Sequence, residues 1–201
     1  MATKKNKGTV GVIGMGIMGG AFARNLAADG WHVIGYDPSK QAAAAAKRAG
    51  VEIAGSARDV ARKAPVILTS LPKPAALHAV ARELAGAKLP KRTLVEMSTF
   101  MIEDKEKARV ALEKAGHTVI DCPVSGTGSQ AANRDLVFYA SGDKPTVKKL
   151  DKMFQSFGRK QRRMRAWHCD PAMPPVVLLR SPAEVERWLS GAGPAQPPAP
   201  V

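Results

Sequence analysis

The sequence predicts an α/β protein in which a doubly wound, mostly parallel sheet carries helices on both faces. Short runs rich in valine, isoleucine and leucine alternate with alanine-rich or amphipathic segments of helical length. This alternation is typical of parallel strands joined by crossover helices, which cover both faces of the sheet. A glycine-rich turn and a helical segment join the first two apolar runs, so the pattern begins near residue 10.

Three glycines, Gly14, Gly16 and Gly19, follow the first apolar run, Val10–Ile13. In a Rossmann-type turn the first glycine permits the tight exit from the strand, and the second lets a pyrophosphate approach the backbone. The third allows the helix to pack closely on the sheet. The helix N-terminus then offers N–H groups to the phosphates. We therefore expect a dinucleotide-binding turn, with glycines that serve packing alone as the alternative.

Asp37 closes the second expected strand, at residues 32–36, and lies 18 residues after Gly19. A carboxylate at this position can accept hydrogen bonds from the adenosine ribose hydroxyls and would repel a 2′-phosphate. The sequence therefore predicts NAD as the cofactor. NADP stays the alternative, because Lys40 could reach a phosphate.

The later elements follow in alternation. Further strands are expected at residues 51–53, 65–70, 93–96, 117–121 and 136–140. Further helices are expected at residues 41–49, 57–63, from 74 onward, 102–115 and 146–157. Ser56 suits an N-cap, Pro74 suits a first helical turn, and Gly50 and Gly116 suit helix ends. The turns after the strands should gather along one edge of the sheet, where such folds bind ligands.

Composition narrows the class of protein. The 201 residues suit one domain and part of another, and no run of eighteen apolar residues predicts a membrane helix. The N-terminus has no apolar stretch typical of a secretory signal. Cys122 and Cys169 are far apart and lack metal-ligand spacing. We expect a reduced, cytoplasmic protein without a metal site.

The net charge of +14 raises the hypothesis of nucleic-acid binding. The basic residues are scattered, however, and aromatic residues make up only 5% of the chain without a stacking motif. We therefore expect no nucleic-acid partner. A positive field also favours an anionic cofactor.

Four motifs occur in a recognisable order. They are Gly14–Gly19, Ser70-Leu71-Pro72, Glu96-Met97-Ser98-Thr99 and Asp121-Cys122-Pro123-Val124-Ser125-Gly126. Together they resemble the β-hydroxyacid dehydrogenase family, which includes 3-hydroxyisobutyrate dehydrogenase and is akin to 6-phosphogluconate dehydrogenase. The resemblance runs from Thr9 to about Gln161. It implies an NAD(P)-dependent oxidoreductase that transfers hydride between the nicotinamide and a small hydroxy acid or its semialdehyde.

The resemblance also implies roles for individual residues. The pyrophosphate would be lined by Gly14, Met15, Gly16, Ile17 and Met18. Leu71 and Pro72 would lie along the cofactor, and Thr99 near the nicotinamide ribose. Ser125 and Gly126 would hold the substrate carboxylate. Thr127 replaces the family's second glycine there, so it would crowd the pocket or add a hydroxyl to it.

The end of the sequence departs from this family. The family's helical second domain carries a catalytic lysine in a Gly-x-x-x-Lys-x-x-Asn-Asn motif, but no lysine follows Lys160 here. Residues 162–201 hold 8 of the 15 prolines. We expect a basic extension at 1–8, a Rossmann domain at 9–161 and an irregular, poorly ordered tail at 162–201.

This departure leaves two pairs of alternatives open. A reading-frame shift near residue 161 would explain the tail and leave the apolar face around Phe154 and Phe157 under-covered, whereas a native proline-rich tail is the other explanation. The chain, with no catalytic residue of its own, is either the cofactor-binding half of a truncated dehydrogenase or an inactive dinucleotide-binding module. A homo-oligomer is compatible with both.

Overall fold

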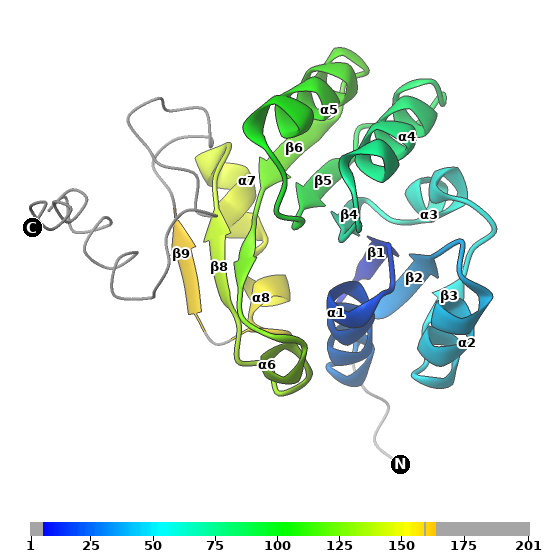
Figure 1. The fold of residues 1–201 in the computed structure, drawn as a ribbon, viewed down its shortest axis with the longest axis vertical. Coiled ribbons are helices and arrows are strands. Elements are labelled where there is room, and N and C mark those ends of the chain that lie inside the picture. The colour runs from blue at the N-terminus through cyan, green and yellow to red at the C-terminus, as the bar shows by residue number, and fades with distance from the viewer. Residues whose placement is uncertain (1–5, 159, 164–201) are drawn as a thin grey trace, which may run out of the picture.

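The computed structural model describes residues 6–158 and 160–163, and its main feature is a six-stranded parallel sheet (Figure 1). The strand order is β3-β2-β1-β4-β5-β6. Its strands are β1 (Thr9–Ile13), β2 (His32–Tyr36), β3 (Glu52–Ile53), β4 (Val66–Thr69), β5 (Thr93–Glu96) and β6 (Thr118–Asp121). This order reverses direction between β1 and β4, as in doubly wound Rossmann folds, so the predicted fold class is confirmed.

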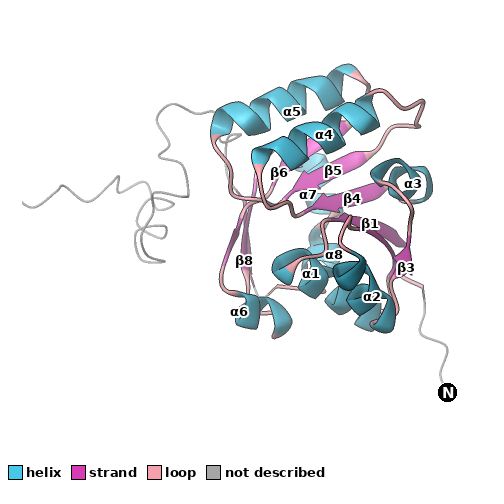
Figure 2. Cartoon of the chain, turned by 45° about the vertical axis from the view of Figure 1, so that its right-hand side comes forward, coloured by secondary structure: helices cyan, strands magenta, loops and turns pink. Residues whose placement is uncertain are grey.

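Helices cover both faces of this sheet, as Figure 2 shows. One face carries α1 (Ile17–Ala28) and α2 (Lys40–Arg48), and the other carries α3 (Ala57–Lys63), α4 (Pro74–Ala85) and α5 (Ile102–Lys114). Within the described part of the chain, no helix is both long and apolar enough to cross a membrane.

Successive side chains of each strand point to opposite faces of the sheet, so the core consists of two clusters, one on each face. Val10 and Val12 of β1 and Leu68 of β4 pack on the α1 side. Ile67 of β4 and Leu94 of β5 pack on the α3, α4 and α5 side. Both faces of the sheet are therefore buried under helices, which explains why these strands appear in the sequence as continuous apolar runs.

A second, three-stranded sheet was not expected. It has the order β7-β8-β9, with β7 (Val124–Ser125), β8 (Val137–Ala140) and β9 (Lys160–Arg163). The strand predicted at residues 136–140 is therefore present as β8, but it lies in this second sheet and not beside the parallel strands. The short helix α6 (Gly128–Ala132) packs on α1 instead of crossing the sheet, so β8 returns antiparallel to β7.

The helix predicted at 146–157 is also wrong in detail. Two short helices occupy this segment: α7 (Lys144–Lys149) and α8 (Asp151–Phe154), which meet at Leu150. The Asp143 carboxylate starts α7 early by accepting a hydrogen bond from the Thr146 N–H at 2.9 Å. Leu150, Met153 and Phe154 all belong to the buried core.

The aromatic face near the end of the described chain is fully covered. Phe154 and Phe157 are 1% and 0% exposed, so the expectation of an under-covered face is wrong. The Phe157 ring lies 5.1 Å from the rings of both Phe22 in α1 and Phe138 in β8. The expected tail lies outside the described residues except for residues 162 and 163, which complete β9.

Candidate functional site

The turns that follow the strands meet at the carboxyl edge of the parallel sheet. Backbone hydrogen bonds extend the strand pairing into these turns: the Gly14 N–H donates to Tyr36 O at 2.9 Å, and the Ser70 N–H donates to Ile13 O at 3.0 Å. The Cys122 N–H donates to Glu96 O at 2.8 Å. All four predicted motifs therefore begin at one edge, as the sequence indicated.

The glycines of the first turn have different steric surroundings. Gly14 has a φ of +86°, and a Cβ atom there would overlap the carbonyl oxygen of Ser70. A Cβ at Gly19 would overlap the carbonyl oxygen of Gly14. A Cβ at Gly16 would have no atom within 4 Å. Packing therefore requires the first and third glycines, whereas the second leaves open space beside the backbone that a side chain would fill.

This open space adjoins the start of α1. Gly16 is the N-cap of the helix, no side chain caps it, and the first turn holds no acidic residue. The first N–H groups of a helix have no partner within it and carry a partial positive charge. A pyrophosphate fits this combination of open backbone and unsatisfied donors.

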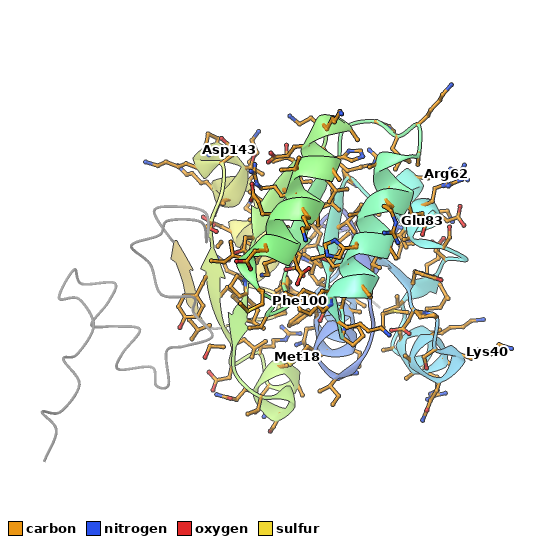
Figure 3. The ribbon with its side chains drawn as sticks, turned by 45° about the horizontal axis from the view of Figure 1, so that its top comes forward. Met18, Lys40, Arg62, Glu83, Phe100 and Asp143 are labelled. Atoms are coloured by element: carbon orange, nitrogen blue, oxygen red, sulfur yellow. The ribbon has the colours of Figure 1, made fainter. Side chains whose placement is uncertain are left out.

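Two predicted phosphate-lining residues, Met15 and Ile17, differ in burial. The Met15 side chain is buried, and its sulfur occupies the space beside Gly35 of β2. Ile17 is 79% exposed at the mouth of the turn. Met15 can therefore contribute only its backbone to a ligand. Met18 is half-buried and packs on the α1 side of the core (Figure 3).

Asp37 is fixed by two backbone donors at the end of β2. Its Oδ2 atom accepts a hydrogen bond from the Met15 N–H at 2.6 Å, and its Oδ1 atom accepts one from the Ser39 N–H at 2.8 Å. The carboxylate is half-buried beside the glycine turn. It therefore ties the turn to the start of α2 and has a defined orientation.

The second and third motifs are joined by a serine to which the sequence analysis gave no role. The Leu71 N–H donates to Ser98 Oγ at 2.8 Å, and the Ser98 N–H donates to Glu96 Oε1 at 2.9 Å. Ser98 is buried, whereas Pro72 and Thr99 are exposed. Ser98 thus connects the two predicted cofactor loops, residues 70–72 and 96–99, through its hydroxyl and its backbone N–H.

The fourth motif lies beside the glycine turn. Asn25 Nδ2 of α1 donates to the carbonyl oxygen of Ala131 in α6 at 2.8 Å, within the buried contact between these helices. Gly128 is so close to Ile17 that a Cβ there would lie 2.5 Å from Ile17 Cγ2. Figure 1 shows α6 next to α1. This juxtaposition brings the predicted substrate residues to the predicted cofactor residues.

The three predicted substrate residues differ in their local roles. Ser125 and Gly126 are exposed at the end of β7, and Gly126 has a φ of +141°, which other residues rarely adopt. Thr127 caps α6: its hydroxyl accepts from the Gln130 N–H at 3.3 Å, and its own N–H donates to Gln130 Oε1 at 2.9 Å. The Thr127 hydroxyl is therefore engaged in a capping box.

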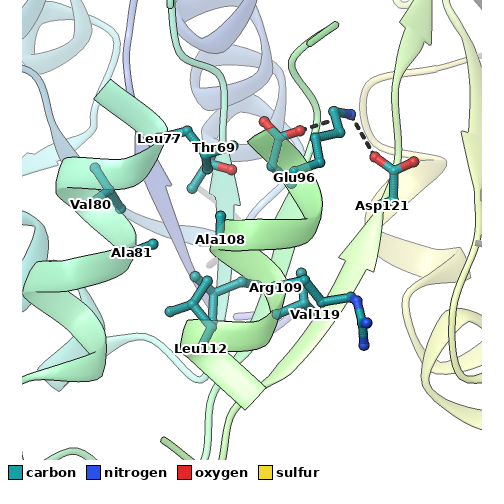
Figure 4. A pocket seen from close by; sticks show the side chains of 12 residues that line it. Thr69, Leu77, Val80, Ala81, Glu96, Ala108, Arg109, Leu112, Val119 and Asp121 are labelled. Carbon is teal, nitrogen blue, oxygen red and sulfur yellow. Dashed lines mark hydrogen bonds and ion pairs between the residues drawn. The ribbon is translucent and has the colours of Figure 1, made fainter. Parts of the chain in front are cut away.

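A buried ionic network underlies these loops. Lys105 Nζ lies 2.8 Å from Glu96 Oε2 and 2.6 Å from Asp121 Oδ1, with Lys105 only 3% exposed (Figure 4). Burial raises the pKa of Glu96. Burial alone would lower the pKa of Lys105, but the charges of Glu96 and Asp121 outweigh it and raise that pKa. The sequence carried one signal for this network: the acidic residues Glu96 and Asp121 each end a strand, and these two strands are neighbours.

The small cavity and the buried thiol near this network do not fit a dinucleotide pocket or a reactive cysteine. The cavity under α4 and α5 that Figure 4 shows has a volume of about 10 Å³, which is too small for a dinucleotide. Cys122 is fully buried, which raises the pKa of its thiol well above the ordinary value. Among the described residues, no group of three or more His, Cys, Asp or Glu side chains could hold a metal ion.

Comparison with known proteins identifies relatives of this chain. It is 30% identical over 141 residues to the probable 3-hydroxyisobutyrate dehydrogenase of Mycobacterium tuberculosis, covering 70% of this chain and 48% of the relative. It is 31% identical over 153 residues to the NAD-dependent L-serine dehydrogenase of Pseudomonas aeruginosa, covering 75% of this chain and 51% of the relative. The chain thus spans about half the length of these curated relatives.

A solved structure and a family model agree with these relatives. The structure of Mycobacterium tuberculosis 3-hydroxyisobutyrate dehydrogenase with L-serine matches with a TM-score of 0.74 and 28% identity, over 77% of this chain and 53% of that chain. Residues 9–168 match the model for the NAD-binding domain of 6-phosphogluconate dehydrogenase. The chain therefore belongs to the family of the NAD-binding domain of 6-phosphogluconate dehydrogenase.

Proposed function

We propose that this chain binds NAD at the carboxyl edge of its parallel sheet and forms the cofactor-binding half of an NAD(P)-dependent hydroxyacid dehydrogenase. The observation that carries the proposal is the open space at Gly16 beside the uncapped N-terminus of α1. Gly14 and Gly19 are required by backbone contacts, but nothing within the described chain needs the space at Gly16. A pyrophosphate at this position would account for it.

The other predicted cofactor residues support the same placement. Asp37 would accept the adenosine ribose hydroxyls at the end of β2, where its orientation is already fixed by the Met15 N–H. Leu71 and Pro72 would lie along the cofactor, and Thr99 near its nicotinamide ribose. When bound, NAD supplies the hydride acceptor of the reaction.

The substrate proposed for this site is a small hydroxy acid. Ser125 would hold its carboxylate through the hydroxyl, and Gly126 through the backbone N–H. The relatives named above act on hydroxyisobutyrate or L-serine by their names. The packing of α6 against α1 supports this proposal, because it puts Gly128, which follows these residues, beside Ile17 of the glycine turn.

A second candidate is a dinucleotide-binding module without turnover. Titration of the purified chain with NADH, followed by NAD and a panel of hydroxy acids, separates the candidates. Binding with turnover supports the dehydrogenase, binding alone supports the module, and failure to bind NADH contradicts both.

A further inference from the structure

We infer that Lys105 is a positioning residue that fixes the predicted cofactor loop and the predicted substrate segment relative to each other, an inference that rests on the proposed function. The cofactor loop is residues 70–72, and the substrate segment is residues 121–127. Neither contains Lys105, which comes from the first turns of α5. The lysine acts through the two carboxylates that it contacts.

The network begins with two acids on neighbouring strands. Glu96 is the last residue of β5, Asp121 is the last residue of β6, and the two are direct partners in the parallel register. Two buried carboxylates side by side repel each other and lose their hydration. The Lys105 amine lies within 2.8 Å of both, and its positive charge offsets the repulsion between them.

One arm of the network reaches the cofactor loop. Glu96 contacts Lys105 with Oε2 and accepts the Ser98 N–H with Oε1, so both oxygens have fixed directions. The Ser98 hydroxyl in turn accepts the Leu71 N–H at 2.8 Å. A displacement of Glu96 is therefore transmitted to the backbone of Leu71 through a single serine.

The other arm reaches the substrate segment. Asp121 opens this segment, and its backbone exchanges two hydrogen bonds with Ser141, with N–O distances of 3.1 and 2.8 Å. The adjacent Cys122 N–H donates to Glu96 O at 2.8 Å. The same two strand ends thus anchor both loops, and the Lys105 amine sets the distance between their carboxylates.

The test uses two buried serines that differ in what their hydroxyls contact. Ser98→Ala removes the link from Glu96 to the Leu71 N–H and leaves the ionic network intact. Ser141→Ala is the matched control: it also removes a buried hydroxyl next to the network, but this hydroxyl contacts Asp121 O at 3.4 Å and no cofactor loop. Glu96→Gln perturbs the first arm at its origin. Lys105→Met is avoided as a single variant, because it removes the cation between two buried carboxylates and can unfold the chain.

Two measurements are made on each variant. Amide hydrogen exchange of Leu71 in the ligand-free chain should become about fivefold faster or more in Ser98→Ala and Glu96→Gln and stay unchanged in Ser141→Ala. The affinity for NADH should fall in the first two variants only. The losses should be less than additive in the Ser98→Ala/Glu96→Gln double variant, since both changes break one arm.

The triple variant Lys105→Met/Glu96→Gln/Asp121→Asn removes all three charges and keeps similar side-chain volumes. It should fold and show the same fast exchange at Leu71, because the oriented carboxylate is gone. Unchanged exchange at Leu71 in Ser98→Ala and Glu96→Gln would overturn the inference. Failure of the unsubstituted chain to bind NADH would instead overturn the proposed function, whatever the exchange rates are.

Discussion

The backbone N–H of Met15 donates a 2.6 Å hydrogen bond to the carboxylate of Asp37, so the glycine turn and the end of β2 are locked together. The acid proposed to bind the ribose is thus also part of the structure of the phosphate turn. Because Asp37 both faces the proposed ribose and holds the glycine turn, its substitution should affect the choice between NAD and NADP and also the affinity for either dinucleotide.

Asp37→Asn should narrow the preference for NADH over NADPH. The substitution removes the negative charge that repels a 2′-phosphate and keeps an oxygen that can accept one of the two N–H groups. We expect the ratio of the two dissociation constants to shift by roughly tenfold towards NADPH. Titrations of both cofactors measure this ratio.

Lys40→Met is the control for this prediction. Lys40 begins α2 and is exposed at the outer edge of the molecule in Figure 3. If NADPH binds the unsubstituted chain as tightly as NADH and weakens in Lys40→Met, the lysine recognises the phosphate. The prediction of NAD as the preferred cofactor would then be wrong.

Gly16→Val should abolish cofactor binding while the fold persists. The new side chain meets no atom of the protein near its Cβ, so the cost should be limited to about 1 kcal/mol at the N-cap. It would occupy the space proposed for the pyrophosphate, and we expect NADH affinity to fall at least about a hundredfold. Thermal unfolding and NADH titration measure the two effects.

Gly19→Ala serves as the contrasting variant. Its Cβ would overlap the Gly14 carbonyl oxygen, so it should destabilise the chain by about 1–3 kcal/mol even without ligand. Should Gly16→Val retain NADH affinity, the pyrophosphate binds elsewhere. Should it lose as much stability as Gly19→Ala, its loss of binding would carry no information on the site.

The parallel sheet and the glycine turn were predictable because their signals are local. A buried strand is a short apolar run, and the glycines stand at fixed offsets after it. Boundaries shifted by only one or two residues, as for β4, expected at 65–70 and found at Val66–Thr69. The order of the motifs along the chain also placed them correctly at one edge of the sheet.

The second sheet and the ionic network were not predictable because they depend on long-range contacts. β7 has two residues and α6 has five, which is too short for a periodic signal. Nothing local indicates that Lys105 points inward, since a lysine in a charged helix is usually solvated. Its burial follows only from the pairing of Glu96 with Asp121.

Glu96→Gln should alter how stability depends on pH. The pKa of Glu96 is raised in the folded chain, so the folded state holds this proton more tightly than the unfolded state. Its contribution to stability is present below 4.5, the ordinary pKa of a glutamate, and is lost as pH rises through the raised pKa of the folded chain. The stability of Glu96→Gln relative to the unsubstituted chain should therefore increase as pH rises above that value. Urea unfolding across this range measures the difference, and a decrease would show that Lys105 outweighs burial.

The last prediction is that the 201-residue chain binds NADH but turns over hydroxy acids poorly. Oxidation of an alcohol by NAD needs a group that accepts the hydroxyl proton as the hydride leaves, and a positioned base typically supplies about a hundred- to ten-thousand-fold in rate. No lysine follows Lys160, and Lys105, at the edge of the site, is buried against two carboxylates. With L-serine or 3-hydroxyisobutyrate, we expect kcat/KM at least about a hundredfold below that of the Pseudomonas aeruginosa L-serine dehydrogenase. Gly16→Val, purified in parallel, gives the background from contaminating dehydrogenases. A rate near that of the relative, absent from Gly16→Val, would show that another group of this chain accepts the proton.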